Sequence, residues 1–146
     1  MIETNIDDMN PELYPVVINK LLELGALDVT ITPALMKKGR PGCILQLLSP
    51  AELEHQLGQV IFEETSAIGY RIYPARRQVL KRVVIQVETC FGNVAVKIAH
   101  QASRIMNIAP EYEDCIKLAQ KNNIAVKAVY NMAIKEAYRF IKQDLI

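Results

Sequence analysis

The chain has 146 residues, a length typical of one domain or of one compact pair of lobes. Seventeen basic and sixteen acidic residues leave a net charge of +1, so no charge excess indicates a nucleic acid or a membrane as partner, and the 51% apolar content is typical of a folded chain. No apolar run approaches the roughly 18 residues of a membrane span, and no secretory leader is recognisable, so we expect a cytoplasmic protein without a membrane partner.

Alternation of apolar and polar residues predicts a strand at the start of the chain, over residues 2–8. Asn10 and Pro11 then predict a helix, with asparagine as its cap and proline at its first position. Gly25 ends this helix, because glycine enters the left-handed closing conformation without strain. The other elements predicted in this half are strands at 27–32, 43–48 and 68–73, a loop at 37–42, and a helix that begins with a capping box at 49–52 and ends near residue 67.

This order, βαββαβ, is that of a ferredoxin-like fold. We expect the first and third strands at the centre of the sheet and the fourth strand beside the second. Beyond them, the sequence predicts a β-hairpin with strands at 82–89 and 94–99, a short helix opened by Pro110, and a last helix with a 3.6-residue period from residue 126. We therefore predict one α+β domain over 1–146, with a ferredoxin-like half (1–78) extended by a β-hairpin and two C-terminal helices (79–146).

The charges are distributed unevenly along the chain. Residues 1–12 hold four acids and no base, residues 68–104 hold seven bases and one acid, and the loop 37–42 holds three bases and two glycines. A nucleoside triphosphate with Mg²⁺ or Mn²⁺ suits this mixture, because lysine and arginine bind phosphate oxygens, carboxylates bind the metal, and glycines admit close backbone approach. The loop is not a Walker A loop, since GxxxxGK[ST] is absent.

Each charged cluster also has a purely structural interpretation, which the sequence leaves open. The basic loop could be a solvated hairpin, and Arg76 with Arg77 could keep a strand edge basic. Asp7 and Asp8 could stabilise the dipole of the following helix; Asp8 suits that role, whereas Asp7 is the better ligand candidate. The acids after Pro110 could be ordinary first-turn residues of a helix. Three scattered cysteines and two histidines predict neither a disulfide scaffold nor a zinc ribbon.

Several segments, in this order, resemble the C-terminal region of the LarC family of nickel insertion proteins. The segments are residues 3–12 (ETNIDDMNPE), 25–29 (GALDV), 32–33 with 36–42 (TP and MKKGRPG), 62–66 with 69–71 (FEETS and GYR), and 110–115 (PEYEDC). The resemblance covers most of residues 2–115, and the first segment is its most specific part.

The resemblance implies a CTP-binding domain that needs Mg²⁺ or Mn²⁺. In the full-length family, CTP use is coupled to placing nickel in a pincer mononucleotide, pyridinium-3,5-bisthiocarboxylic acid mononucleotide, whose product is the cofactor of lactate racemase. Because the large N-terminal region of the family is missing here, we expect this module to bind nucleotide without completing metal insertion by itself.

Resemblance and charge together assign candidate residues. For the nucleotide these are Lys37, Lys38, Gly39, Arg40 and Gly42, then Arg71, Arg76 and Arg77 as further phosphate or pincer-phosphate contacts, with Glu113 and Asp114 orienting the ribose or base. For the metal, Asp7 comes first, with Asp8 and Glu3 behind it.

Two other functions compete with this hypothesis. A regulatory or oligomerisation module is one, since ferredoxin-like sheets often pair, and we expect a homo-oligomer in either case. RNA binding is the other, because RNA-recognition motifs share the βαββαβ order. However, aromatic residues make up only 6% of the chain, and no strand carries the paired aromatic pattern on which bases stack, so no nucleic-acid partner is expected.

Overall fold

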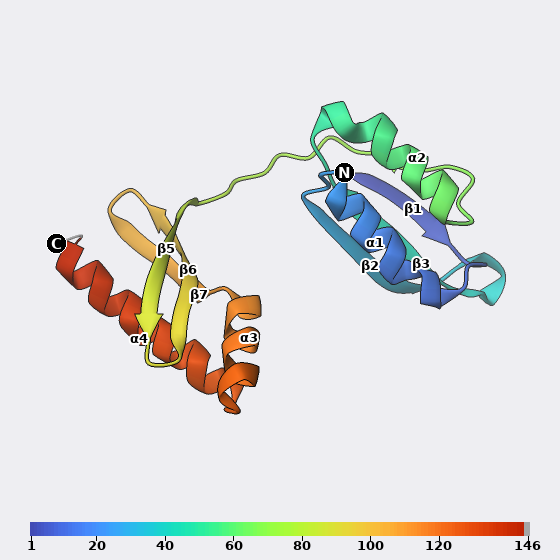
Figure 1. Cartoon of the computed structure of the whole chain (residues 1–146). Helices are drawn as coiled ribbons and strands as arrows, with labels where there is room; N and C mark the ends of the chain where they lie inside the picture. Colours follow the sequence, from blue (N-terminus) through green and yellow to red (C-terminus); the bar gives the residue numbers. More distant parts are fainter. Residues whose placement is uncertain (145–146) are drawn as a thin grey trace. The chain divides into compact units, whose positions relative to one another are not determined.

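A computed structural model describes the chain from residue 1 to residue 144. The chain separates into two compact units, Met1–Arg76 and Arg77–Ile146 (Figure 1). Each unit buries its own cluster of apolar side chains. The predicted α+β class is confirmed, since each unit combines an antiparallel sheet with two helices.

The first unit has the predicted βαββαβ order. Its elements are β1 (Ile2–Ile6), α1 (Tyr14–Glu23), β2 (Asp28–Leu35), β3 (Pro41–Leu48), α2 (Glu54–Glu64) and β4 (Arg71–Ile72), with short 3₁₀ turns at Pro11–Leu13, Lys37–Gly39 and Ala51–Leu53. The strands lie in the order β2-β3-β1-β4, and all neighbours are antiparallel. The expectation that the fourth strand lies beside the second is wrong, because each crossover passes over one strand and β4 therefore pairs with the free edge of β1.

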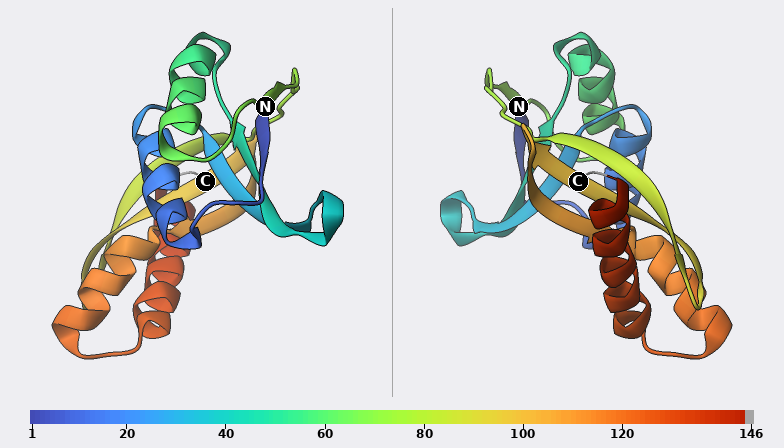
Figure 2. Two further views of the ribbon diagram at one scale, coloured as in Figure 1. Left: turned by 90° about the vertical axis from the view of Figure 1, so that its right-hand side faces the viewer. Right: turned by 90° about the vertical axis from the view of Figure 1, so that its left-hand side faces the viewer.

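One face of this sheet is buried and the other is open. The helices α1 and α2 cover one face of the sheet (Figure 2), and Ile2, Thr4 and Ile6 of β1 are buried. Leu21 of α1 and Leu57 of α2 are fully buried on the same side. The intervening residues of β1 point to the opposite face, as the two-residue period of a strand requires. The open face therefore carries the polar side chains that reach the candidate site.

The predicted boundaries of the first helix hold. The Asn10 side chain accepts a hydrogen bond from the Glu12 backbone N–H at 3.1 Å, and Gly25 closes the helix with a φ of 102°. Two other local predictions are wrong. No capping box forms at 49–52, because extended Pro50 takes the cap position and the 3₁₀ turn begins at Ala51 without a side-chain cap. The strand predicted at 68–73 contains only Arg71–Ile72, and the Thr4 hydroxyl, rather than a strand partner, binds the Gly69 carbonyl at 2.7 Å.

The second unit is a three-stranded sheet with two helices. Its elements are β5 (Lys81–Thr89), β6 (Gly92–Gln101), β7 (Arg104–Pro110), α3 (Tyr112–Asn122) and α4 (Val126–Asp144). The predicted hairpin of β5 and β6 is present, but a third strand, β7, pairs with β6. Pro110 ends this strand instead of opening a helix, because an edge strand tolerates a residue that lacks an N–H. Among the helices of residues 1–144, none is long and apolar enough to cross a membrane.

Candidate functional site

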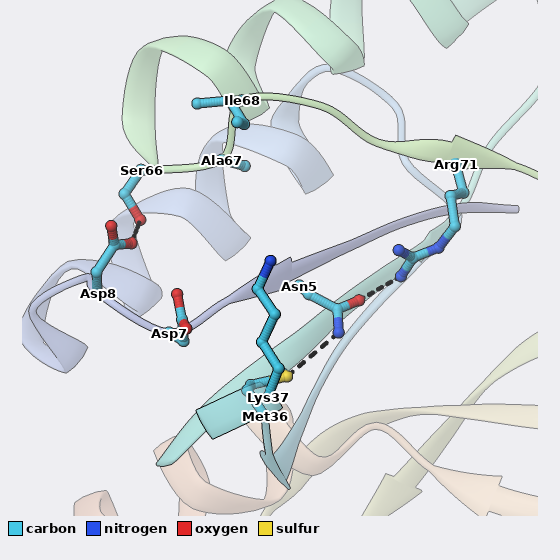
Figure 3. A pocket seen from close by; sticks show the side chains of 9 residues that line it. All are labelled: Asn5, Asp7, Asp8, Met36, Lys37, Ser66, Ala67, Ile68 and Arg71. Atoms are coloured by element: carbon cyan, nitrogen blue, oxygen red, sulfur yellow. Dashed lines mark hydrogen bonds between the residues drawn. The ribbon is translucent and has the colours of Figure 1, made fainter. Parts of the chain in front are cut away.

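A pocket of about 480 Å³ lies in the first unit, where the end of β1, the β2–β3 hairpin and the segment after α2 meet. Its lining residues are Asn5, Asp7, Asp8, Met36, Lys37, Ser66, Ala67, Ile68 and Arg71 (Figure 3). The structure thus brings the candidate metal ligand Asp7 and the candidate phosphate ligands Lys37 and Arg71 to one cavity. These residues belong to segments up to 64 positions apart, counted from Asp7 to Arg71.

The tight β2–β3 hairpin determines which basic side chain lines the pocket. The Met36 N–H donates to the Arg40 carbonyl at 2.7 Å, and Lys38 and Gly39 both have left-handed backbones, with φ of 62° and 70°. Two successive residues with left-handed backbones form a tight turn that reverses the direction of the chain. Lys37 lines the pocket, whereas Lys38 and Gly39 are exposed at the tip and do not.

Gly42 holds the base of this hairpin against β1. A Cβ atom at position 42 would lie 2.5 Å from the Ile6 carbonyl oxygen and 3.0 Å from the Asp7 Cα. Only a residue without a side chain permits this approach. Gly42 therefore sets the distance between the hairpin and the aspartate, and this packing is its role in the structure.

The two aspartates have different partners. Asp7 Oδ2 lies 3.6 Å from Arg40 Nη1, in a loose ion pair whose guanidinium is more than half exposed. Asp8 accepts a hydrogen bond from the Ser66 hydroxyl, which ties the end of β1 to the segment after α2 (Figure 3). Asp7 thus has the weaker interaction with its neighbouring side chain, and it is the better placed of the two carboxylates to bind a ligand.

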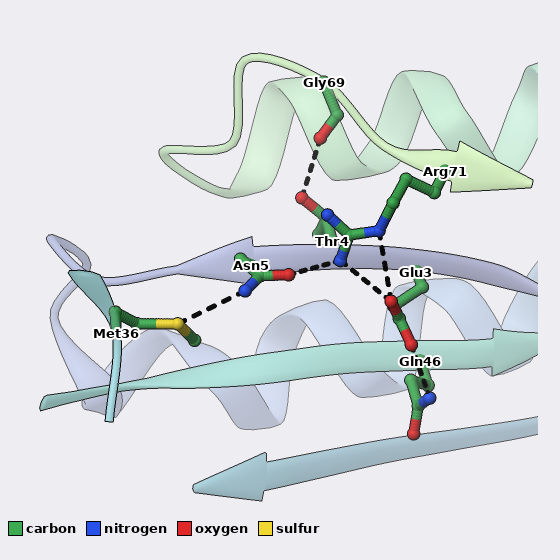
Figure 4. A network of polar contacts seen from close by, with 7 residues as sticks. All are labelled: Glu3, Thr4, Asn5, Met36, Gln46, Gly69 and Arg71. Carbon is green, nitrogen blue, oxygen red and sulfur yellow. Dashed lines mark hydrogen bonds and ion pairs between the residues drawn. The ribbon is translucent and has the colours of Figure 1, made fainter. Parts of the chain in front are cut away.

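A polar network on the open face of the sheet fixes Arg71 (Figure 4). Arg71 Nε and Nη2 donate to Glu3 Oε1 at 3.1 and 2.8 Å, and Nη2 also donates to Asn5 Oδ1. The second oxygen of Glu3 accepts from Gln46 Nε2 at 2.6 Å, while Asn5 Nδ2 contacts Met36 Sδ at 3.2 Å. Both Glu3 oxygens are therefore engaged, and Glu3 does not line the pocket in which it was expected to bind metal.

This network makes the free energy of unfolding depend on pH in the acidic range. Hydrogen bonds from Arg71 and then from Gln46 lower the pKa of Glu3 below its ordinary value of about 4.3. A lowered folded-state pKa stabilises the fold above the unfolded-state pKa, and this contribution is lost as the pH falls through the folded-state value.

We accordingly expect Arg71→Ala to be less stable than the parent protein at pH 6, by up to about 1 kcal/mol because the pair is partly exposed. The difference should shrink as the pH falls from 5 toward 3. Urea unfolding of both proteins across this range measures it, and a difference that does not change with pH would contradict the role of the Glu3 carboxylate.

The donor set of the pocket fits a metal ion that is already bound to phosphates. Within the described part of the chain, no three His, Cys, Asp or Glu side chains gather at one point as a metal site. A nucleotide-bound Mg²⁺ or Mn²⁺ needs only one or two carboxylates, because phosphate oxygens and waters supply the other ligands. Asp7 and Asp8 meet that requirement, and neither an imidazole nor a thiol lines the pocket.

The remaining candidate residues lie outside this pocket. Arg76 and Arg77 are exposed on the segment at which the first unit ends and the second begins. Glu113 and Asp114 belong to the first turn of α3 in the second unit. Asp114 Oδ2 accepts from the Ala95 N–H at 3.1 Å, so it joins α3 to β6.

Several lining residues were not predicted because they carry no charge. Asn5, Met36 and Ser66 orient charged neighbours, while Ala67 and the fully exposed Ile68 provide an apolar wall. Asn5, Met36 and Ser66 do occur inside the segments that carry the family resemblance. Membership in those segments was the only signal in the sequence that could have indicated them. In the apolar core of the first unit, Cys43 Sγ donates to Tyr14 Oη at 3.0 Å, and burial raises the pKa of Tyr14 to about 12.

Comparisons with known proteins match the chain to nickel insertion proteins. The model of a family described as nickel insertion protein matches residues 1–130. A pyridinium-3,5-bisthiocarboxylic acid mononucleotide nickel insertion protein of Clostridium acetobutylicum is 45% identical over 136 residues, which are 93% of this chain and 32% of the relative. The protein of that description from Thermotoga petrophila is 41% identical over 136 residues, 93% of this chain and 34% of the relative. The chain thus spans about a third of the length of these relatives.

Two solved structures are similar to the chain. One is LarC2, the C-terminal domain of a cyclometallase involved in the synthesis of the NPN cofactor of lactate racemase, in its apo form. It has a TM-score of 0.87 and 38% identity, over 93% of this chain and 94% of that one. The other is a protein of Methanopyrus kandleri AV19, with a TM-score of 0.65 and 24% identity over 90% of this chain and 81% of that one, a likeness of fold alone.

Proposed function

Because the chain belongs to the nickel insertion protein family, we propose that it is the CTP-binding module, with Mg²⁺ or Mn²⁺, of a CTP-dependent cyclometallase. The whole enzyme, a lyase, inserts nickel into pyridinium-3,5-bisthiocarboxylic acid mononucleotide on the way to the cofactor of lactate racemase. Nickel and the pincer mononucleotide are its substrates, and the part of the relatives that lies outside the matched third acts together with this module.

The observation that carries the proposal is the meeting of Asp7, Lys37 and Arg71 at one pocket. A triphosphate needs cationic donors, and its metal needs a carboxylate on the other side. The volume of about 480 Å³ lies in the range of small-molecule sites, roughly 300–1,000 Å³. Met36, Ala67 and Ile68 offer an apolar surface to the ribose or base.

The residues of the pocket would act by positioning and by neutralising charge. Glu3 and Asn5 hold Arg71 in place through its Nε and Nη2 atoms, and the rest of the guanidinium would contact a phosphate oxygen. Lys37 adds a mobile point charge. Arg40 does not line the pocket, but it contacts Asp7 at its edge and can exchange this loose contact for a phosphate. When bound, the divalent ion neutralises the triphosphate and holds it for attack.

Calorimetric titration with CTP, with and without Mn²⁺, tests this proposal. We expect Asp7→Asn to weaken Mn-CTP binding at least tenfold, because a metal ligand is lost. Metal-free CTP should bind this variant as well as the parent or better, since a negative charge near the phosphates is removed. Asp28→Asn, an exposed acid at the opposite end of β2 from the hairpin, is the matched control. Absence of binding by the parent, or an unchanged Mn-CTP affinity of Asp7→Asn, would refute the proposal.

Self-association without catalysis is the second candidate function. Within the described strands, β5 pairs only with β6, so one edge of β5 is free, and Val83 and Val84 on it are exposed. A free strand edge with apolar side chains favours pairing with another chain. Light scattering with and without Mn-CTP separates the candidates, because a purely structural module assembles independently of the nucleotide.

A further inference from the structure

We propose that the second unit holds a separate binding site for a phosphate monoester with a flat ring, the chemistry of an aromatic mononucleotide. The site is the groove beside the turn between β6 and β7, and none of its lining residues belongs to the first unit. The pincer mononucleotide belongs to this chemical class, and only that identification rests on the proposed function.

The body of the ligand would lie in an apolar groove of about 580 Å³. Its walls include Val83 of β5, Ile98 of β6, Ile105 of β7 and Ile141 of α4. Along β5, Val87 is 3% exposed under the helices, but Val83 in the same row is 46% exposed. The apolar row of the sheet thus continues beyond the helical cover, and it leaves a surface that a flat ring can cover.

Cationic side chains border this groove. His100 and Arg104 line it, and an adjoining groove of about 780 Å³ shares His100 and adds Arg77 and Lys81. Among the described residues that line either groove, none is an aspartate or a glutamate. Arg77, Lys81 and Arg104 also have no ion-pair partner within the described residues, whereas Lys97 of the same sheet is paired with Glu111. A phosphate dianion would act as the ion-pair partner of these cations.

The turn between β6 and β7 holds one of these groups in place. Lys81 lies directly opposite His100 in the sheet, so both side chains project from adjacent strands at the same level. His100 Nδ1 lies 3.0 Å from the carbonyl oxygen of Ala102, which has a left-handed φ of 50°. When Nδ1–H donates to that carbonyl, Nε2 is directed away from the turn, and in the imidazolium form it can donate to a phosphate oxygen.

The same features disfavour other anions. A metal-bound triphosphate requires a carboxylate for its metal, and the described part of this site offers none. Single-stranded RNA requires aromatic platforms for its bases, and neither groove is lined by Phe, Tyr or Trp. A phosphate monoester that carries one flat ring matches both the cations, through its phosphate, and the groove, through the faces of its ring.

Calorimetric titration of the whole chain with nicotinic acid mononucleotide tests the site, because this probe joins a pyridinium ring to a ribose 5′-phosphate. We expect Arg104→Gln to weaken its binding at least tenfold and exposed Val83→Ser at least threefold. Lys127→Gln, an exposed lysine of the same unit outside both grooves, should leave binding unchanged. Because Arg104 is exposed, Arg104→Gln should melt at the parent temperature and bind Mn-CTP as the parent does.

This inference would be overturned by no binding of the mononucleotide, by unchanged affinity of Arg104→Gln, or by equal affinity for ribose 5-phosphate, which lacks the ring. Displacement of the probe by an equimolar single-stranded RNA would also overturn it, in favour of a nucleic-acid surface. Mn-CTP binding without mononucleotide binding refutes this site alone. Mononucleotide binding without Mn-CTP binding refutes the proposed nucleotide site in the first unit alone.

Discussion

Lys37→Ala is expected to weaken the binding of Mn-CTP at least tenfold, which corresponds to about 1.4 kcal/mol. Lys37 is the lysine of the hairpin that lines the pocket, on the side opposite the end of β1 (Figure 3). Its ammonium group would meet a triphosphate in a partly enclosed site, where charge-assisted hydrogen bonds are stronger than those of exposed groups. Calorimetry at constant ionic strength measures the loss.

Lys38→Ala is the matched control for this experiment. It removes the same charge from the adjacent position, but Lys38 is exposed at the hairpin tip and does not line the pocket. We expect a loss well below that of Lys37→Ala, because an exposed charge acts through solvent and is screened by salt. Equal losses for the two variants would show that the hairpin acts only as a diffuse positive charge.

Gly42→Ala is expected to destabilise the protein by about 2–3 kcal/mol, the upper part of the usual range for overpacking, because the backbone at this site cannot relax. The added methyl group would lie 2.5 Å from the Ile6 carbonyl oxygen and 3.0 Å from the Met36 side chain. Relief requires the hairpin to move away from β1, which also separates Lys37 from Asp7. Denaturant unfolding should therefore show lower stability, and calorimetry should show weaker Mn-CTP binding.

Gly69→Ala provides the comparison for that variant. No atom lies within 4 Å of the position that its Cβ would take, and its backbone is not left-handed. The stability of Gly69→Ala should stay within about 0.5 kcal/mol of the parent, as for other unconstrained surface positions. A similar destabilisation by both substitutions would mean that the contact between Gly42 and Ile6 is not the cause.

The sequence predicted the elements in which local patterning and tertiary packing agree. β1 to β3 alternate or are continuously apolar, and Asn10 and Gly25 mark the ends of the first helix by their own backbone chemistry. β7 was missed because its burial does not alternate and because Pro110 suggested a helix start. Only pairing with β6 makes that segment a strand, and such pairing is invisible in one segment alone.

The same limit applies to the candidate site. Charge clustering pointed to Asp7 and Lys37, which the structure places at one pocket. Glu3, however, lies opposite Arg71 in the pairing of β1 and β4, and this register converts an expected metal ligand into the anchor of an arginine. The sequence could not predict that Glu3 and Arg71 pair in this register, because the two residues are 68 positions apart.

A crystal structure of the chain with Mn²⁺ and CTP tests the central claim most directly, since the anomalous signal of manganese locates the metal independently of the nucleotide. The account predicts manganese within about 2.2 Å of an Asp7 carboxylate oxygen, near the octahedral ligand distance of such ions, with the triphosphate between Lys37 and Arg71. Manganese and triphosphate bound elsewhere, with Asp7 still paired to Arg40, would contradict it.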